Sequence, residues 1–254
     1  FMDPAAFERV EIVKGPVGAT QGGVTSTLGP YGAGGSINLV QKQPRPERAF
    51  TDVSLRSTLG EDLQRHRFSL DLNEPLIEER LTVRLPLSFE TGKPFWLPDN
   101  ARWRESFLLA PSLLCHVRDD LRIGFSLTLQ HTDQPAYQGI PVHRGKPFGG
   151  YDWDSSIATS GMRDRYLGHT AQTYVEWDAS PVWTLRTGAG LAYSEVDFEH
   201  LGASAFANPD GSITARAYTL RPYDHSEGDL TFRRYTLYQR ATARYETGPL
   251  SHET

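Results

Sequence analysis

The residue types that carry catalytic or metal chemistry occur in this chain at spacings that fit none of the usual sites. The histidines are scattered and form neither an H-E-x-x-H nor an H-x-x-E-H motif. Asp152 and Asp154 stand two residues apart in YDWDSS, which differs from the pattern of a calcium loop. Cys115 is the single cysteine and lies in an alternating apolar run, which favours a packed or lipid-facing thiol over a nucleophile. We therefore expect no enzyme, no metal site and no intrinsic cofactor.

Binding chemistry is better represented, because aromatic and arginine side chains gather in the long segments between apolar runs. Aromatic rings stack on flat ligands and on cations, and arginine donates paired, charge-assisted hydrogen bonds to anions. Loop-to-loop packing is the alternative role for each of these residues. The candidate ligand-binding residues of the loops are Phe95, Trp96, Trp103, Tyr137, Arg144, Tyr151, Trp153, Arg163, Tyr218 and Arg221, with Tyr223 and Tyr238 as further ones.

The elements that must position these loops are strands. From Arg48 onward apolar and polar residues alternate with a period of two, which indicates strands with one apolar and one polar face. Alternation is clearest in LRIGFSLTLQ, where Leu121, Ile123 and Phe125 face away from Arg122 and Ser126. About eight strands are predicted, at residues 50–59, 67–73, 81–90, 106–117, 121–130, 167–177, 183–193 and 234–246.

The predicted connections alternate between short and long. Short ones lie at 73–79, 118–120, 178–182 and 246–250, and long ones at 91–102, 131–164 and 195–230, with a short hairpin at 60–62 as the exception. Short turns at one end and long loops at the other, with aromatics near strand ends, are typical of an outer-membrane barrel. Hairpin packing in a soluble β-protein is the alternative. No apolar run reaches the ~18 residues of a spanning helix, and the net charge of −5 argues against nucleic-acid binding.

Two linked motifs near the start of the chain carry a resemblance. FERVEIVKGP at 7–16, followed by GPYGAGGSINLVQKQP at 29–44, resembles the end of the plug domain of TonB-dependent outer-membrane receptors, in the form of the ferric-siderophore branch. A phosphate-binding loop is a poorer interpretation, since the G-K-[ST] ending is missing. The residues that match the plug motif are Glu8, Arg9, Glu11, Lys14, Gly15, Pro16, Gly34, Gly35, Asn38 and Lys42.

The resemblance implies an all-β fold class. It divides the chain into the C-terminal part of a small mixed α/β plug domain at 1–47 and the N-terminal part of an antiparallel transmembrane β-barrel at 48–254. The family often has an aromatic at the ligand-facing apex of the plug where this chain has Gln21, with Tyr31 further along; these two are the apical candidates. Because eight strands are fewer than the roughly 22 of the full barrel, we expect a fragment that does not fold stably alone.

The implied function is active transport across the bacterial outer membrane. The resemblance predicts a receptor that binds and imports ferric-siderophore complexes, with iron held only inside the ligand, energised by the TonB–ExbB–ExbD complex and surrounded by outer-membrane lipid. Alternatives within the family are receptors for cobalamin or a saccharide. Alternatives outside it are a self-contained small barrel with a structural or adhesion role, and a soluble β-sandwich binding module.

Overall fold

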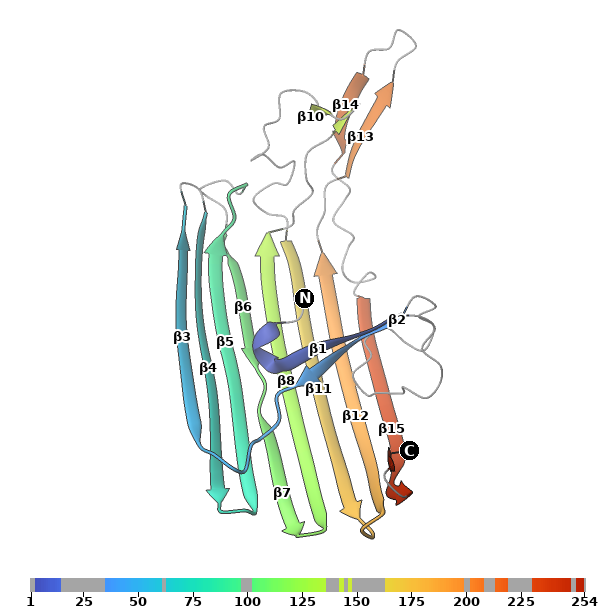
Figure 1. Ribbon diagram of the computed structural model, residues 1–254. Helices are drawn as coiled ribbons and strands as arrows, with labels where there is room; N and C mark the ends of the chain where they lie inside the picture. Colours follow the sequence, from blue (N-terminus) through green and yellow to red (C-terminus); the bar gives the residue numbers. More distant parts are fainter. Residues whose placement is uncertain are drawn as a thin grey trace.

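The computed structural model describes residues 3–14, 35–60, 63–96, 102–135, 142–143, 146–147, 163–198, 202–207, 213–218, 230–247 and 250–253. Its main feature is one large antiparallel sheet, drawn in Figure 1 as a single layer of tall strands. The strands of this sheet are β3 (Phe50–Leu59), β4 (Gln64–Ile77), β5 (Leu81–Lys93), β6 (Arg104–Leu109), β7 (Ser112–Arg118), β8 (Leu121–Pro135), β11 (Arg163–Asp178), β12 (Trp183–Phe198), β15 (Leu230–Thr247) and β16 (Leu250–Glu253).

The strands follow one another in sequence order across the sheet, from β3 at one edge to β15 and β16 at the other. β6 and β7 both pair with β5 and with β8, so they act as one strand that is interrupted at Ala110 and Pro111. All eight predicted strands are therefore present, and the antiparallel all-β class is confirmed.

The sheet buries its polar face and exposes its apolar one. Along β5, Thr82, Arg84, Ser88 and Glu90 are buried at 4% exposure or less, while Phe89 on the opposite face is 44% exposed. The same outward face carries Phe125 of β8 and Leu237 of β15, both strongly exposed. In a soluble sheet the apolar face packs into the core and the polar face meets water. The observed reversal is the arrangement of a wall whose apolar side meets lipid.

The two ends of the sheet differ in their connections. The turns that follow β4, β7 and β11 are short, whereas the chain takes long paths between β5 and β6, β8 and β11, and β12 and β15 (Figure 1). Residues 73–79, predicted as a turn, mostly belong to β4, because a register shift between Pro75 and Ile77 lets the strand continue past the proline. The turn itself is 78–80, where Glu79 has a φ of 58° and the Arg80 N–H donates to Ile77 O.

Two short hairpins lie within the long connections. β9 (Val142–His143) pairs with β10 (Lys146–Pro147), and β13 (Gly202–Ala207) pairs with β14 (Ile213–Tyr218). Both hairpins lie in segments predicted to be long loops, since neither has a sustained alternation of apolar and polar residues. In Figure 1 both hairpins stand beyond the end of the sheet that carries the long connections.

Residues 3–14 and 35–41 form a separate small unit against the polar face. A 3₁₀ turn, η1 (Pro4–Ala6), leads into β1 (Phe7–Lys14), which pairs antiparallel with β2 (Gly35–Gln41) and crosses the large sheet at mid-height (Figure 1). Ala6 packs with Leu108 and Ala110 in a small buried core. The described part of 1–47 holds no α-helix, and its two strands are antiparallel, so the mixed α/β character expected of a plug is not seen there. No helix in the described residues is long and apolar enough to cross a membrane.

A row of alternating glycines and tyrosines crosses the polar face of the sheet. Gly124, Tyr174, Gly188 and Tyr238 are paired in turn across β8, β11, β12 and β15. Each tyrosine ring covers a glycine on the strand before it, in the space that a Cβ would occupy. The Arg186 guanidinium lies 3.7 Å from the centre of the Tyr174 ring, and its Nε donates to the Tyr238 hydroxyl. Glycine is required at 124 and 188 because the tyrosine ring on the next strand leaves no room for a Cβ, and not because of the backbone conformation.

Candidate functional site

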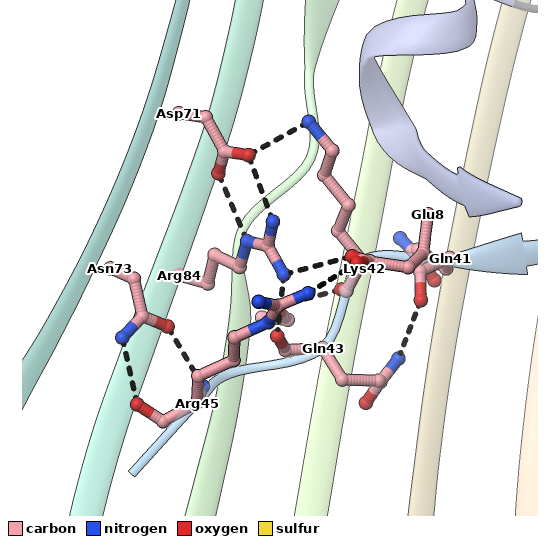
Figure 2. A network of polar contacts seen from close by, with 9 residues as sticks. Glu8, Gln41, Lys42, Gln43, Arg45, Asp71, Asn73 and Arg84 are labelled. Atoms are coloured by element: carbon pink, nitrogen blue, oxygen red, sulfur yellow. Dashed lines mark hydrogen bonds and ion pairs between the residues drawn. The ribbon is translucent and has the colours of Figure 1, made fainter. Parts of the chain in front are cut away.

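Arg84 is the centre of the contact between the small unit and the sheet (Figure 2). It lies on the buried face of β5, and its side chain is only 4% exposed. Its Nε and Nη2 donate to the two carboxylate oxygens of Asp71 on β4, at 3.0 and 2.9 Å. Its Nη1 reaches Glu8 of β1 at 3.2 Å and the carbonyl of Gln43 at 2.9 Å. One guanidinium thus joins two strands of the sheet to the unit that lies across them.

The segment that links β2 to β3 is held to the same face. Lys42 Nζ donates to Asp71 at 2.7 Å, and Arg45 pairs with Glu8. Asn73 is fully buried and accepts from the Arg45 N–H at 2.8 Å while its own amide donates to Arg45 O at 2.9 Å. Figure 2 shows these contacts around Arg84 on the polar face of the sheet. Asp71 and Glu8 each pair with two cations, and Arg84 also donates to the Gln43 carbonyl, so the charge of buried Arg84 is well compensated.

Asp3 ties η1 to the sheet a short distance away. Its carboxylate caps η1 through the Ala5 N–H and also accepts from Arg67 Nη2 at 2.5 Å and Ser88 Oγ at 2.8 Å. Burial raises the pKa of this carboxyl, but the hydrogen bonds from Arg67, Ala5 and Ser88 lower it by more than burial raises it. The resulting pKa lies below the ordinary value. Asp3 is therefore an ionised anchor at neutral pH.

Glu90, near the end of β5, is one carboxylate surrounded by three arginines. Its carboxylate is 2% exposed and pairs with Arg65, Arg67 and Arg104. Arg65 and Arg104 also line a cavity of about 300 Å³, together with Lys93, Trp96 and the ends of β4, β5, β6 and β8. Of the ligand-binding residues predicted from sequence, Trp96 is thus placed beside cationic groups in a cavity on the polar face. We call this the β5-end pocket.

Arg163 lies in a second ion-pair cluster, at the start of β11. It is buried and pairs with Asp133 of β8, while its Nη1 and Nη2 donate to the carbonyls of Arg102 and Trp103 at 3.1 and 3.0 Å. The structure therefore brings two predicted residues, Trp103 and Arg163, together, but through the backbone of Trp103. With these donors committed, Arg163 fixes the path of the chain into β6, which is a positioning role.

The other predicted ligand-binding residues are placed as follows. Phe95 follows β5 and is 38% exposed. Tyr238 lies in the glycine–tyrosine row, and Tyr218 is the last residue of β14, with its backbone opposite Gly202. Outside the described residues lie Gln21, Tyr31, Tyr137, Arg144, Tyr151, Trp153, Arg221 and Tyr223.

The motif residues near the start of the chain divide between contact and scaffold. Glu8 and Lys42 contact the sheet, whereas Arg9 and Glu11 pair with each other along β1. Lys14, Gly35 and Asn38 lie in the paired strands β1 and β2. Gly15, Pro16 and Gly34 lie outside the described residues.

Several residues of the site were not singled out from sequence. Asp3, Arg67, Asp71, Asn73 and Arg104 were missed, although the alternating pattern places most of them on a polar face. Charged residues at inward positions of neighbouring strands were the available signal. Among the described residues, no group of three or more His, Cys, Asp or Glu side chains is placed to hold a metal ion.

Comparison with known proteins gives matches in sequence and in structure. No family model matches the chain. The metal-pseudopaline receptor CntO of Pseudomonas aeruginosa is 30% identical over 228 residues, which cover 86% of this chain and 28% of that receptor. The chain thus spans less than a third of the length of the curated relatives that it matches.

The solved structures agree on the fold. The ferric-catecholate import receptor Fiu of Escherichia coli K12, in its open form, superposes with a TM-score of 0.73 at 22% identity, over 99% of this chain and 38% of that one. FpvA of P. aeruginosa, bound to a heterologous pyoverdine, superposes with a TM-score of 0.73 at 17% identity, over 100% of this chain and 31% of that one. The sequence similarity to CntO, together with the fold that these structures share, shows that the chain belongs to the TonB-dependent outer-membrane receptor family.

Proposed function

We propose that the chain forms the end of the plug and the first part of the barrel wall in a receptor that imports metal-chelate complexes. The plug part is residues 1–47 and the barrel part is residues 48–254. The observation that carries the proposal is the similarity to CntO, a receptor named for a metal-chelator ligand, over 86% of the chain. Ferric siderophores are the ligand class suggested by the plug motifs, and metal-pseudopaline is a ligand of the relative.

The contacts of the small unit suit a plug that is held firmly but reversibly. Its charged anchors Asp3 and Glu8, with Lys42 of the segment that follows, meet side chains on the polar face of the sheet, and among the described residues the apolar contact is limited to Ala6 and its neighbours. A polar interface can exchange its partners for water, whereas a large apolar interface cannot do so without a large cost. Such a plug can be displaced by a mechanical pull and can then return.

The roles of partner proteins and ligand residues follow from this arrangement. The TonB–ExbB–ExbD complex is proposed to pull on the plug. Outer-membrane lipid is proposed to contact the apolar face of the sheet. The candidate aromatic and arginine residues of the long connections other than Arg163, with Gln21 and Tyr31 of the plug, are proposed to contact the ligand at the outer side. Loss of Trp96 or Trp153 is then expected to weaken chelate binding.

Uptake measurements test this function. Cells that carry the receptor containing this chain are grown under metal limitation and given radiolabelled ferric and nickel chelates. The proposal predicts accumulation of at least one chelate that requires both the receptor and an intact TonB system. Equal accumulation in cells that lack the receptor would contradict it, and accumulation that is independent of TonB would point to a passive barrel.

A further inference from the structure

We propose that the β5-end pocket binds a carboxylate group of the imported chelate, so that the receptor selects chelates with free carboxylates. This inference rests on the proposed function and gives that function a ligand class. Three cations, Arg65, Lys93 and Arg104, line the pocket against one carboxylate, Glu90. Glu90 is itself shared with Arg67, so the lining carries net positive charge.

Arg104 has the geometry of an incomplete anion site. Its Nη1 contacts Glu90, while its Nε is buried and has no hydrogen-bond partner among the described residues. A buried donor without an acceptor is unfavourable, and an oxygen atom that enters beside it removes that penalty. A guanidinium presents its donors as a planar fork, which fits the two oxygens of a carboxylate.

The remaining lining favours an organic anion over an inorganic one. Trp96, Pro94, Leu63 and Pro135 provide an apolar wall beside the cations. The cavity of about 300 Å³ is at the lower limit for small-molecule sites. It therefore accommodates one arm of a chelate, with the carboxylate on Arg104 and the carbon skeleton against Trp96, and the rest of the complex lies in the open space of the lumen.

The position of the pocket agrees with entry of ligand from the side of the long connections. Its residues lie at the ends of β4, β5, β6 and β8 that face away from the turns after β4, β7 and β11. Arg65, with a side chain that is 55% exposed, is the accessible cation, and Arg104 is 34% exposed. An anion is thus attracted first by an exposed arginine and then held by a more buried one.

Calorimetric titration of the purified full-length receptor tests the inference. The probes are ferric citrate and ferric nitrilotriacetate, which carry carboxylates, and the ferric complex of a linear trihydroxamate, which does not. The variants are Arg104→Gln and Trp96→Leu, with Arg240→Gln as the control. Arg240 is an exposed arginine of β15, far across the sheet from the pocket. Arg104→Gln leaves Glu90 paired with Arg65 and Arg67, so the fold is preserved.

The inference predicts that a carboxylate chelate binds and that Arg104→Gln weakens its binding about 10-fold or more, the loss expected for one charge-assisted hydrogen bond. Trp96→Leu is expected to weaken it less, and Arg240→Gln by under twofold. If carboxylate chelates bind equally to all variants, or if only the trihydroxamate binds, the inference is wrong and the proposed function stands. If none of the three chelates binds, the inference is overturned, and the uptake experiment above decides the proposed function separately.

Discussion

Replacing Arg84 by methionine should loosen the small unit from the sheet while the sheet itself stays folded. Arg84 is 4% exposed and donates four hydrogen bonds: two to Asp71, one to Glu8 and one to the Gln43 carbonyl. Breaking a buried ion pair by removing one partner costs about 3–5 kcal/mol. Lys42 continues to pair with Asp71, and Arg45 with Glu8, so neither acid is left alone. We therefore expect a loss of about 2–3 kcal/mol, below that range, because both acids keep a cationic partner.

Hydrogen exchange of the full-length receptor measures this loss directly. A weakening of about 2–3 kcal/mol speeds exchange through local opening about 30- to 150-fold. The acceleration should appear in β1 and β2 and be absent from the middle of β8 and β11. Arg9→Met is the matched control, because Arg9 is 61% exposed and pairs only with Glu11 on the same strand among the contacts described. An exposed pair of this kind contributes about 0–1 kcal/mol.

A double-mutant cycle isolates the contact between the two units. Glu8→Gln removes the partner on β1, while the Arg84–Asp71 pair within the sheet remains. We expect a coupling energy between Arg84 and Glu8 of about 1 kcal/mol. If Arg84→Met and Arg9→Met accelerate exchange of β1 and β2 equally, or if exchange does not change, then the ion pairs do not hold the small unit and the reasoning is refuted.

Three further predictions concern the sheet and η1. Gly124→Ala should destabilise the receptor by about 1–3 kcal/mol in thermal or denaturant unfolding, because the new methyl group displaces the Tyr174 ring from beneath Arg186; Gly60→Ala, with ordinary contact distances, should be near neutral. Leu87→Arg on the outward face should cost about 2–4 kcal/mol in a refolding assay with lipid vesicles, whereas Thr236→Arg on the inward face of β15 should cost much less, and equal costs would contradict the assignment of the faces. Because the folded pKa of Asp3 is lowered, its contribution is complete above the ordinary carboxyl value of 3.8 and disappears as the pH falls through the folded pKa. Local opening at η1, measured as the exchange rate relative to the intrinsic rate at each pH, should therefore be unaffected by Asp3 titration between pH 7 and about pH 5 and become more frequent below about pH 4. Asp3→Asn should remove this acid-dependent step.

Much of the fold was predictable because successive residues of a strand point to opposite faces, so the sequence of a strand with one apolar face alternates. The run at 121–130 alternates without a break, and the structure places it in β8 with Phe125 exposed and Ser126 buried. Which face is buried was not contained in the alternation itself, since a soluble sheet and a membrane wall share the pattern. The plug motifs and the asymmetry of the connections decided between them, and the burial of Ser88 and Glu90 agrees with that decision.

The site was less predictable because it depends on register. Arg84 and Asp71 are 13 positions apart in the chain, and their contact follows from the pairing of Asp71 with Pro86 across β4 and β5. Asp3 precedes the motif region and contacts Arg67 and Ser88, which no short-range pattern connects to it. Composition pointed to Trp96, which lines the β5-end pocket, and to Arg163, whose donors go to Asp133 and two backbone carbonyls, but it overlooked Arg104. The difference between these two arginines is the state of their donors, which only the three-dimensional contacts reveal.

Quenching by brominated lipid tests the central claim, that this sheet is a membrane wall with its polar face turned to the lumen. A fluorescent label is attached at single cysteines placed at 83, 85, 87 and 173–175 of the cysteine-free full-length receptor in vesicles. The account predicts strong quenching at 83, 85, 87, 173 and 175 and weak quenching at 174, so that the signal alternates with a period of two along β11. Uniformly weak quenching, or quenching that is strongest at 174, would show that the apolar face does not meet lipid and would contradict the account.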